Sequence, residues 1–200
     1  MGDRFTDVSV FILAGGKSTR MGTDKAFVPL DGRTLLARAL DLARQITSDV
    51  HIVGDRRKFA PFAPVVEDEF PGCGPLGGIH AALRSSHSEL NVIMAVDTPF
   101  VSLALLHHII TRARNCQSAT VTVPHANGGW QPLCAVYRRE FAAAAEHALT
   151  QGRYKIDALF EDQKINAIGE EELQSAGFAP RIFQNVNTPE ELADAASGHR

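Results

Sequence analysis

Residues 13–25 read Leu-Ala-Gly-Gly-Lys-Ser-Thr-Arg-Met-Gly-Thr-Asp-Lys, and they end a short apolar run over residues 8–13 that is rich in β-branched side chains. Such a run is typical of a buried strand. Gly15 and Gly16 let backbone N–H groups approach a ligand closely, while Arg20 and Lys25 add positive charge. The stretch therefore predicts a polyphosphate-binding loop. An ordinary surface turn is the alternative on local composition alone.

Two other phosphate-binding motifs are excluded by their spacing. A P-loop needs a glycine five residues before Gly16, and Phe11 stands at that position. The glycines of residues 72–77 have the spacing of a dinucleotide-binding fingerprint, but Pro71 and Pro75 interrupt the run. We interpret that second match as chance.

The composition is that of a globular protein. The chain has 200 residues and a net charge of -3, which gives no support to nonspecific nucleic-acid binding. No run of about eighteen apolar residues occurs, so we expect no membrane span, and the first residues do not resemble a signal peptide. Cys73, Cys116 and Cys134 are widely spaced and odd in number, which argues against a disulfide framework and against a four-ligand zinc site. We expect a cytoplasmic protein.

Hydrophobic periodicity predicts strands that alternate with helices in the first half of the chain. Strands are expected over residues 8–13, 50–53 and 91–96, with helices over residues 34–46 and 79–87. Strands that are apolar on both faces and alternate with helices indicate a parallel sheet covered on both sides. Its ligand is expected beyond the carboxyl ends of the strands.

The alternation loosens in the second half. A turn is expected at Asn127-Gly128, and a last helix is expected to start near Pro189. The other expected elements are helices over residues 103–114, 141–149 and 156–160 and strands over residues 119–123, 131–137 and 165–168.

Asp97 follows the apolar strand of residues 91–96 directly, so its carboxylate is expected at the carboxyl end of that strand. A hard carboxylate there suits Mg²⁺, which takes oxygen ligands and keeps waters and substrate phosphates around it. The alternative is an aspartate that caps the next helix.

The stretch of residues 13–25 resembles the signature of nucleotidyltransferases, and within that group the molybdenum cofactor guanylyltransferases, which attach GMP to molybdopterin. Three further blocks carry the resemblance: Asp68 with Gly74-Pro75-Leu76-x-Gly78, Asp97-x-Pro99, and Asn-Val-Asn-Thr-Pro at residues 185–189. It extends from Leu13 to Leu192. The sequence departs from many relatives at Val96, where they have cysteine, and from some at Gly54, where they have a nucleotide-contacting asparagine.

The resemblance implies an α/β fold, a three-layer α/β/α Rossmann-like nucleotidyltransferase whose mostly parallel sheet has an antiparallel strand in its C-terminal half. It also implies one domain over residues 1–200. Residues 1–100 would bind the nucleotide and residues 101–200 the acceptor.

The resemblance assigns roles to individual side chains. Lys25 would contact the α-phosphate, Arg20 the departing pyrophosphate, and Asp97 would hold Mg²⁺, so these three are the expected catalytic residues. Nucleotidyl transfer relies on cations placed against the transferring group rather than on a protein nucleophile. The implied nucleotide-binding residues are Leu13, Ala14, Gly15, Gly16, Lys25, Asp68, Gly78, Asp97, Asn185 and Asn187.

Two of these assignments keep alternatives. Asp68 is expected at the guanosine, although Glu67 or Glu69 has the same chemistry and the segment also suits a charged loop. Asn185 and Asn187 point the same way if the segment is extended, and acceptor or metal contacts are implied for them. They also suit turn residues before a capped helix.

The second half offers weaker candidates for the pterin. Gln131-Pro132-Leu133 also occurs in relatives on the presumed molybdopterin side, and Trp130 is a candidate for covering the pterin. His80, His107 and His108 lack metal-ligand spacing and are expected on helix faces.

The implied substrates are GTP and molybdopterin, with Mg²⁺ as cofactor and transient contacts with proteins that deliver or accept the molybdenum cofactor. A cytidylyltransferase is the alternative within the class, but relatives that use CTP more often have alanine at the position of Gly15. A non-catalytic nucleotide-binding module is the alternative of another class, and the presence of both Lys25 and Asp97 argues against it. The absence of a P-loop argues against a GTPase.

Overall fold

The computed structural model describes residues 4–15, 24–186 and 191, and the account of the structure is confined to them. Its centre is a mixed sheet with the strand order β10-β7-β9-β6-β1-β4-β5, in which β8 also pairs with β7. The strands are β1 (Val8–Leu13), β4 (Val50–Val53), β5 (Val65–Val66), β6 (Leu90–Ala95), β7 (Val121–Ala126), β8 (Gly129–Trp130), β9 (Cys134–Arg138) and β10 (Ile165–Ile168). A separate hairpin consists of β2 (Pro29–Leu30) and β3 (Arg33–Thr34).

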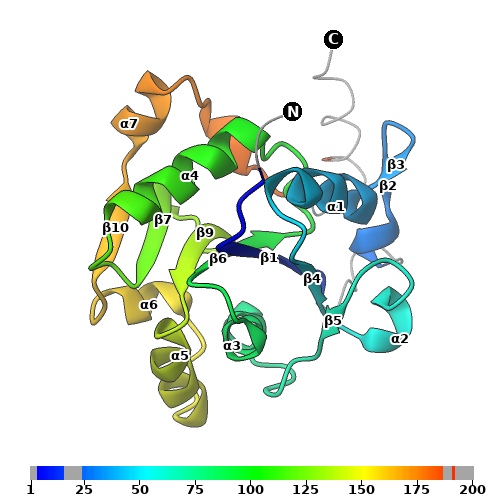
Figure 1. The fold of residues 1–200 in the computed structure, drawn as a ribbon, viewed down its shortest axis with the longest axis horizontal. Coiled ribbons are helices and arrows are strands. Elements are labelled where there is room, and N and C mark those ends of the chain that lie inside the picture. Colours follow the sequence, from blue (N-terminus) through cyan, green and yellow to red (C-terminus); the bar gives the residue numbers. More distant parts are fainter. Residues whose placement is uncertain (1–3, 16–23, 187–190, 192–200) are drawn as a thin grey trace.

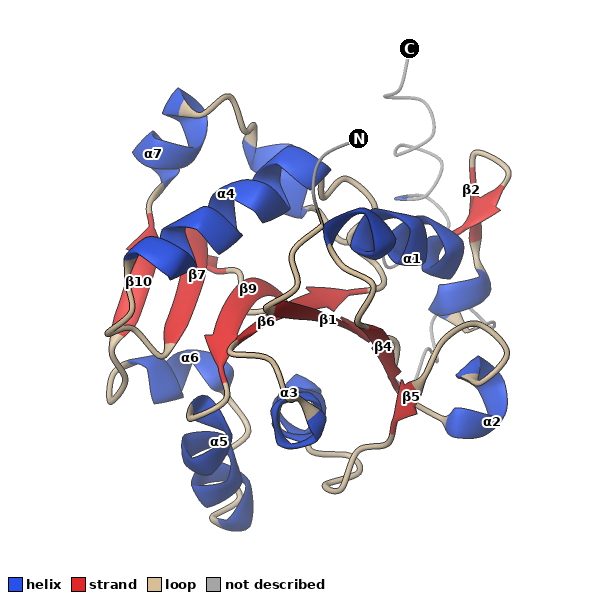
Figure 2. Ribbon diagram, in the orientation of Figure 1, coloured by secondary structure: helices blue, strands red, loops and turns tan. Residues whose placement is uncertain are grey.

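Helices cover both faces of this sheet. They are α1 (Leu35–Ile46), α2 (Arg56–Phe59), α3 (Pro75–Ser85), α4 (Leu103–Asn115), α5 (Phe141–Thr150), α6 (Ile156–Phe160) and α7 (Glu170–Ser175), with 3-10 turns at η1 (Lys25–Phe27) and η2 (Pro180–Phe183). Figures 1 and 2 show α1, α4 and α7 on one face and α3, α5 and α6 on the other. The three-layer α/β arrangement is confirmed.

The strand directions agree with the prediction of a mostly parallel sheet. β1 is parallel to β4 and β6, β4 is parallel to β5, and β10 is parallel to β7. β9 runs antiparallel to both of its neighbours, β6 and β7. The expected antiparallel strand in the C-terminal half is therefore present, and the short β8 is antiparallel as well.

The apolar run that begins the chain is buried on both faces. Val8, Val10 and Ile12 belong to the core between the sheet and the helices α1 and α4. Phe11 and Leu13 belong to the core on the other face, between the sheet and the helices α3 and α5. Successive side chains of a strand point to opposite faces, so a strand between two helical layers must be apolar throughout. This requirement explains the continuous apolar pattern of residues 8–13.

The first long helix has the ends that its sequence favours. The Thr34 hydroxyl accepts a hydrogen bond from the Ala37 N–H at 3.2 Å and caps α1. Six residues on its inner face are buried, namely Leu35, Leu36, Ala39, Leu40, Ala43 and Ile46.

Three of the expected boundaries were wrong. The helix expected over residues 79–87 starts at Pro75, because proline suits the first helical position and Gly74, with φ 71°, makes the turn that precedes it. The strand expected over residues 119–123 is β7, and it continues to Ala126. The strand expected over residues 131–137 is β9, and it begins only at Cys134, because residues 132 and 133 form a turn; the short β8 precedes it, separated from β7 by a tight hairpin turn at Asn127, with φ 56°, and Gly128.

Polar side chains are buried where β1 and β6 begin. The Ser9 hydroxyl donates to the Asp49 carboxylate and lies 2.7 Å from the Ser88 hydroxyl. The Asn91 amide donates to the Tyr137 carbonyl at 3.2 Å and so joins β6 to β9. Most buried polar groups in proteins are hydrogen-bonded, and these contacts satisfy Ser9 and Asn91 in the core.

This cluster shifts the acidity of Asp49. Burial acts to raise the pKa of the Asp49 carboxyl, but hydrogen bonds with Ser9 and His51 and the charges of His51 and His87 outweigh it. The pKa is therefore lower than that of an ordinary aspartate.

The helix expected near Pro189 lies outside the described residues, apart from Glu191. Within the described part of the chain, none of the helices has the length and apolar character needed to span a membrane.

Candidate active site

The carboxyl ends of three neighbouring strands meet at one edge of the sheet. The Val96 N–H donates to the Leu13 carbonyl at 3.1 Å, and the Ala14 N–H donates to the Val53 carbonyl at 3.0 Å. These bonds fasten the residues that follow β6 and β1 to the adjoining strand ends. Ligands of α/β proteins bind at this edge.

Lys25 and Asp97 lie against each other at this edge. The Lys25 Nζ is 3.1 Å from the Asp97 Oδ2, and their side chains are 24% and 19% exposed. They come from separate segments, the 3-10 turn η1 and the loop after β6. The carboxyl-end prediction for Asp97 is confirmed, and the structure brings two of the three expected catalytic residues together.

Asp97 does not cap the following helix. Ser102 occupies the cap position of α4, and its hydroxyl accepts the Leu105 N–H at 3.2 Å. The capping alternative is thus wrong.

The chemistry of this edge fits Mg²⁺. Among the described residues no group of three or more His, Cys, Asp or Glu side chains is arranged around a metal site. Mg²⁺ does not need such a group, because it is commonly bound by one or two carboxylates together with water and substrate phosphates. Asp97 supplies a partly exposed carboxylate of this kind.

The segment that contains Asn185 lies beside Asp97. The Val186 N–H donates to the Asp97 backbone carbonyl at 2.9 Å, and the Val186 side chain is fully buried. Asn185 is exposed next to this anchor. The structure therefore joins the last matching block to the Asp97 loop, while Asn187 lies outside the described residues.

The Asp68 carboxylate lies against the first turn of α3. Its Oδ1 accepts the Phe70 N–H at 2.8 Å. A Cβ added at Gly77 would lie 2.7 Å from both carboxylate oxygens, so the carboxylate occupies the space that a side chain at this position would need. Gly77 was not singled out from the sequence, although the glycine-rich start of the helix was the available signal.

Gly78 has a packing role in the structure. It is buried, and a Cβ there would lie 3.3 Å from the Leu13 Cδ2 and 3.5 Å from the Val53 Cγ1. The missing side chain lets α3 approach the ends of β1 and β4. Leu13 and Ala14 are themselves buried, Gly15 is exposed, and Gly16 and Arg20 lie outside the described residues.

The structure gives a physical reason for glycine at position 54. A Cβ on Gly54 would lie 2.8 Å from the Phe59 Cε2, which is too close to the ring of this buried phenylalanine. An asparagine at this position would require the Phe59 ring to shift. The neighbouring helix therefore takes the space of that side chain.

Side chains expected near the pterin are engaged in packing. The Gln131 amide donates to the Ala126 carbonyl at 2.9 Å and supports the β7–β8 turn. Trp130 packs edge-on against His125 and Phe160, with ring centres 4.9 and 5.6 Å apart.

The three histidines lie on helices, as expected. His80 is buried on α3, 3.8 Å from the Glu146 carboxylate, and edge-on to Phe70. His107 and His108 lie on α4. His107 contacts the ring of Phe5, and the His108 Nε2 is 3.1 Å from the Glu172 Oε1.

Two charged residues that the sequence reasoning did not assign to the site are close to Lys25. Asp24 caps η1 by accepting the Ala26 N–H at 3.2 Å, and its other carboxylate oxygen is 2.8 Å from the Lys58 Nζ. Lys58 belongs to α2, a helix too short to give a periodic pattern. Its contact with Asp24 has no signal in the sequence.

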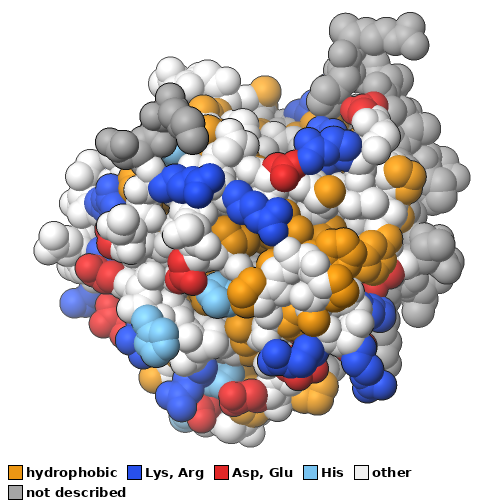
Figure 3. Space-filling view, turned by 45° about the vertical axis from the view of Figure 1, so that its right-hand side comes forward, with side chains coloured by type: hydrophobic (Ala, Val, Ile, Leu, Met, Phe, Trp, Pro, Cys, Tyr) orange, Lys and Arg blue, Asp and Glu red, His pale blue; other side chains and the backbone are white. Residues whose placement is uncertain are grey.

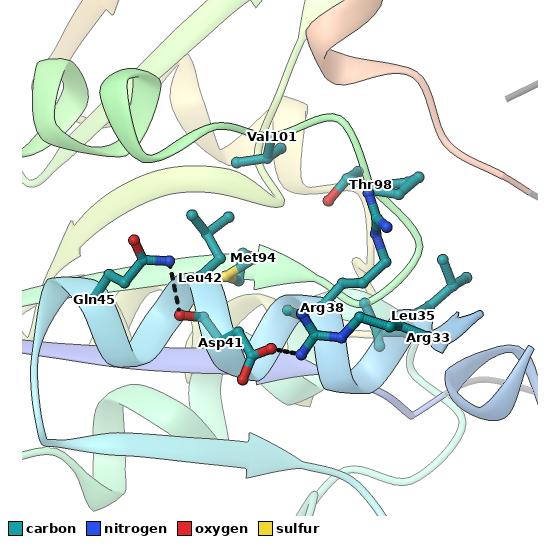
Figure 4. A pocket seen from close by; sticks show the side chains of 12 residues that line it. Arg33, Leu35, Arg38, Asp41, Leu42, Gln45, Met94, Thr98 and Val101 are labelled. Atoms are coloured by element: carbon teal, nitrogen blue, oxygen red, sulfur yellow. Dashed lines mark hydrogen bonds and ion pairs between the residues drawn. The ribbon is translucent and has the colours of Figure 1, made fainter. Parts of the chain in front are cut away.

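A hollow of about 280 Å³ lies on the other side of the Asp97 loop, between α1 and residues 96–101. Figure 4 shows Arg38 reaching toward Thr98 and Arg33 paired with Asp41. Met94 and Val96 contribute to its apolar lining.

Comparisons with known proteins establish the family. The family model described as the MobA-like NTP transferase domain matches residues 10–167. This chain belongs to the MobA-like NTP transferase family. The match covers most of β1, all of β4 and β6, and both Lys25 and Asp97.

Individual members of the MobA-like family align along most of the chain. A molybdenum cofactor guanylyltransferase from Desulfosudis oleivorans is 37% identical over 195 residues, covering 94% of each protein. A protein of the same name from Vibrio cholerae is 31% identical and covers 97% of this chain and 94% of its own length. The crystal structure of molybdopterin-guanine dinucleotide biosynthesis protein A from Archaeoglobus fulgidus superposes with a TM-score of 0.82 at 29% identity, covering 94% of this chain and 97% of that one.

Proposed function

We propose that this protein transfers GMP from GTP to the phosphate of molybdopterin and releases pyrophosphate. The similarity to guanylyltransferases along most of the chain supports this reaction. The observation that carries the proposal is the contact between Lys25 and Asp97 at the convergent strand ends. This pair offers a cation and a metal-binding carboxylate to one small region.

The reaction is an in-line displacement at the α-phosphorus of GTP. An oxygen of the acceptor phosphate forms the new bond while the bond to the pyrophosphate oxygen breaks. The acceptor needs no general base, because a phosphate monoester is already largely ionised near pH 7. Lys25 would stabilise the charge that develops on the α-phosphate. Arg20, on the same loop, is proposed to contact the leaving pyrophosphate.

Asp97 would hold Mg²⁺, which neutralises phosphate charge when it is bound. Before the nucleotide binds, Lys25 neutralises the Asp97 carboxylate. The same Nζ would then be able to contact a phosphate oxygen of the bound nucleotide. Asn185, next to the segment anchored on the Asp97 carbonyl, is proposed to contact the acceptor or the metal.

Asp68 is proposed to accept hydrogen bonds from the guanine or ribose. Its carboxylate is held against α3 by the Phe70 N–H, so its position is fixed before the nucleotide arrives. Residues 1–100 would then bind the nucleotide and residues 101–200 the acceptor, in one domain. We also propose that the protein works in the cytoplasm and contacts proteins that deliver or accept the cofactor.

The first experiment compares nucleotide binding by wild type and by Lys25→Ala. Thermal shifts are measured with GTP, CTP, ATP and UTP, each with Mg²⁺, since a ligand that binds the folded state raises the melting temperature. We expect a shift selective for GTP that Lys25→Ala loses. A shift selective for CTP would instead support a cytidylyltransferase, and the absence of any shift would contradict nucleotide binding.

The second experiment tests catalysis through Asp97→Ala. We expect this variant to lose pyrophosphate release and dinucleotide formation from GTP and molybdopterin, because the Asp97 carboxylate is the proposed metal ligand. Asp41→Ala, on the far side of the Asp97 loop, serves as the control for a lost surface carboxylate. Unchanged turnover of Asp97→Ala would refute the mechanism.

A further inference from the structure

The residues on both sides of Lys25 are held by one short helix, α2. Asp24 precedes Lys25, and its carboxylate is 2.8 Å from the Nζ of Lys58. Phe27 follows two residues after Lys25, and its ring stacks on that of Phe59 with centres 5.8 Å apart. Lys58 and Phe59 are the last two residues of α2.

The Asp24 carboxylate serves two purposes at once. One oxygen accepts the Ala26 N–H and starts the 3-10 turn that contains Lys25, while the other pairs with Lys58. The Asp24 side chain is 21% exposed and the Lys58 side chain 51%, so the pair lies at the surface, where solvent screens it. The hydrogen bond with Asp24, and then its charge, raise the pKa of the Lys58 ammonium above its usual value.

An aromatic contact fixes the other end of the turn. Phe59 is 1% exposed and fills the space beside Gly54, whereas Phe27 and Phe62 are 38% and 44% exposed. Phe27 also lies 5.8 Å from the ring of Phe62. Figure 3 turns this side of the molecule forward and shows hydrophobic side chains gathered among lysine and arginine side chains.

The first residue of α2 faces the nucleoside side of the site. The Arg56 Nη2 donates to the Val65 carbonyl at 3.0 Å, and its Nε lies 3.2 Å from the Glu67 carboxylate. Glu67 immediately precedes Asp68. One helix thus contacts the segment of the proposed phosphate-binding lysine and the segment of the proposed nucleoside-binding aspartate.

We propose that α2 is a positioning element that places Lys25 against the α-phosphate, with Lys58 and Asp24 as the pair that carries this effect. The inference rests on the proposed function and concerns residues that need not touch the substrate. An exposed ion pair usually contributes little to stability, so its loss should leave the fold intact. A small displacement of a reacting group, in contrast, lowers rates strongly.

The test uses Lys58→Ala with Arg57→Ala as the matched control. Arg57 is the neighbouring residue on α2, its side chain is 95% exposed, and its Nε lies 3.9 Å from the Asp55 carboxylate rather than on the Lys25 turn. We expect Lys58→Ala to lower kcat about tenfold with little change in the KM for GTP. A displacement of a catalytic group by about 1 Å can lower the rate up to 10²-fold. Lys58→Arg should restore most of the rate, and Arg57→Ala should behave as wild type.

A double-mutant cycle separates positioning from direct substrate contact. Asp24→Asn keeps an oxygen that caps η1 but removes the charge that Lys58 needs. If the two residues act through each other, Asp24→Asn combined with Lys58→Ala should be no slower than the slower single variant. Losses that add, or a raised KM for GTP with unchanged kcat, would instead place Lys58 on the substrate and overturn the inference.

Failure of the inference is distinguishable from failure of the proposed function. If wild type transfers GMP and Lys58→Ala is as fast as Arg57→Ala, α2 does not position Lys25, although the enzyme assignment stands. If wild type transfers no GMP to molybdopterin, the proposed function is wrong and the inference falls with it. Melting temperatures of all variants, measured without ligand, verify that each one is folded.

Discussion

Substituting Gly77 by alanine moves the Asp68 carboxylate without changing Asp68 itself. The new Cβ would lie 2.7 Å from both carboxylate oxygens and 3.0 Å from the Asp68 Cγ, which is closer than any stable contact. The carboxylate can rotate away because it is the end of a side chain. In doing so it gives up the hydrogen bond from the Phe70 N–H.

Two effects on stability nearly cancel in Gly77→Ala. Alanine favours a helix by about 1 kcal/mol over glycine. Loss of a hydrogen bond to a charged acceptor costs about 1.5–3 kcal/mol. We expect a net loss of about 1 kcal/mol, which lowers the melting temperature by about 2–4 °C in a protein of this size. The variant should therefore fold and be suitable for binding measurements.

The effect on GTP binding should be larger. If the displaced carboxylate no longer accepts hydrogen bonds from the nucleoside, about 1.5–3 kcal/mol of binding free energy is lost. Because 1.4 kcal/mol corresponds to a tenfold change, the Kd for GTP should rise about 10- to 100-fold. The Kd for pyrophosphate, which lacks a nucleoside, should not change.

Isothermal titration calorimetry with GTP and with pyrophosphate, each with Mg²⁺, measures both constants. Asp68→Ala is the matched variant and should weaken GTP binding to a similar extent. GTP binding by folded Gly77→Ala at wild-type strength would refute the assignment of Asp68 to the nucleoside. An equal loss of pyrophosphate affinity would show that the substitution disturbs the phosphate loop instead.

The structure makes three further predictions. Gly54→Asn should destabilise the fold by about 1–3 kcal/mol, since its Cβ overlaps the Phe59 ring, and an unchanged melting temperature would contradict this. Asp49→Asn should be less stable than wild type at pH 7, and the deficit should shrink as pH falls below 3.8: a lowered pKa adds stability that is fully present above the unfolded value of 3.8 and is lost as pH falls through the lower folded value. A difference in melting temperature that does not change with pH would contradict the lowered pKa. Burial raises the pKa of the Cys134 thiol to about 12, so a thiol reagent at pH 8 should label this cysteine only after denaturation, and labelling of the native protein at the rate of the two partly exposed cysteines would show that it is accessible.

The parts of the fold that depend on periodic burial could be predicted from the sequence. β1 and α1 are long, have a buried face and carry clear end signals, such as the Thr34 cap. The convergence of Lys25 and Asp97 was also accessible, since strand topology places both beyond carboxyl ends. The two residues are 72 positions apart in the sequence, but the expected sheet topology brings their segments to the same edge.

Features that depend on individual side-chain contacts could not be predicted. α2 has four residues and α7 has six, too few for a helical period to emerge. The exclusion of a side chain at Gly77 by Asp68, and the pairing of Asp24 with Lys58, depend on how loops fold back in space. Composition and spacing carry no information about either contact.

The bond from the Val186 N–H to the Asp97 carbonyl has a consequence for how the protein matures on the ribosome. Chains fold from the N-terminus during synthesis, so the strands β1, β4 and β6 can associate while later residues are still being added. The Asp97 carbonyl, however, receives its donor only after residue 186 has emerged. A nascent chain can thus form the nucleotide-side sheet early, whereas the loop that carries its proposed metal ligand is secured only once residue 186 has been added.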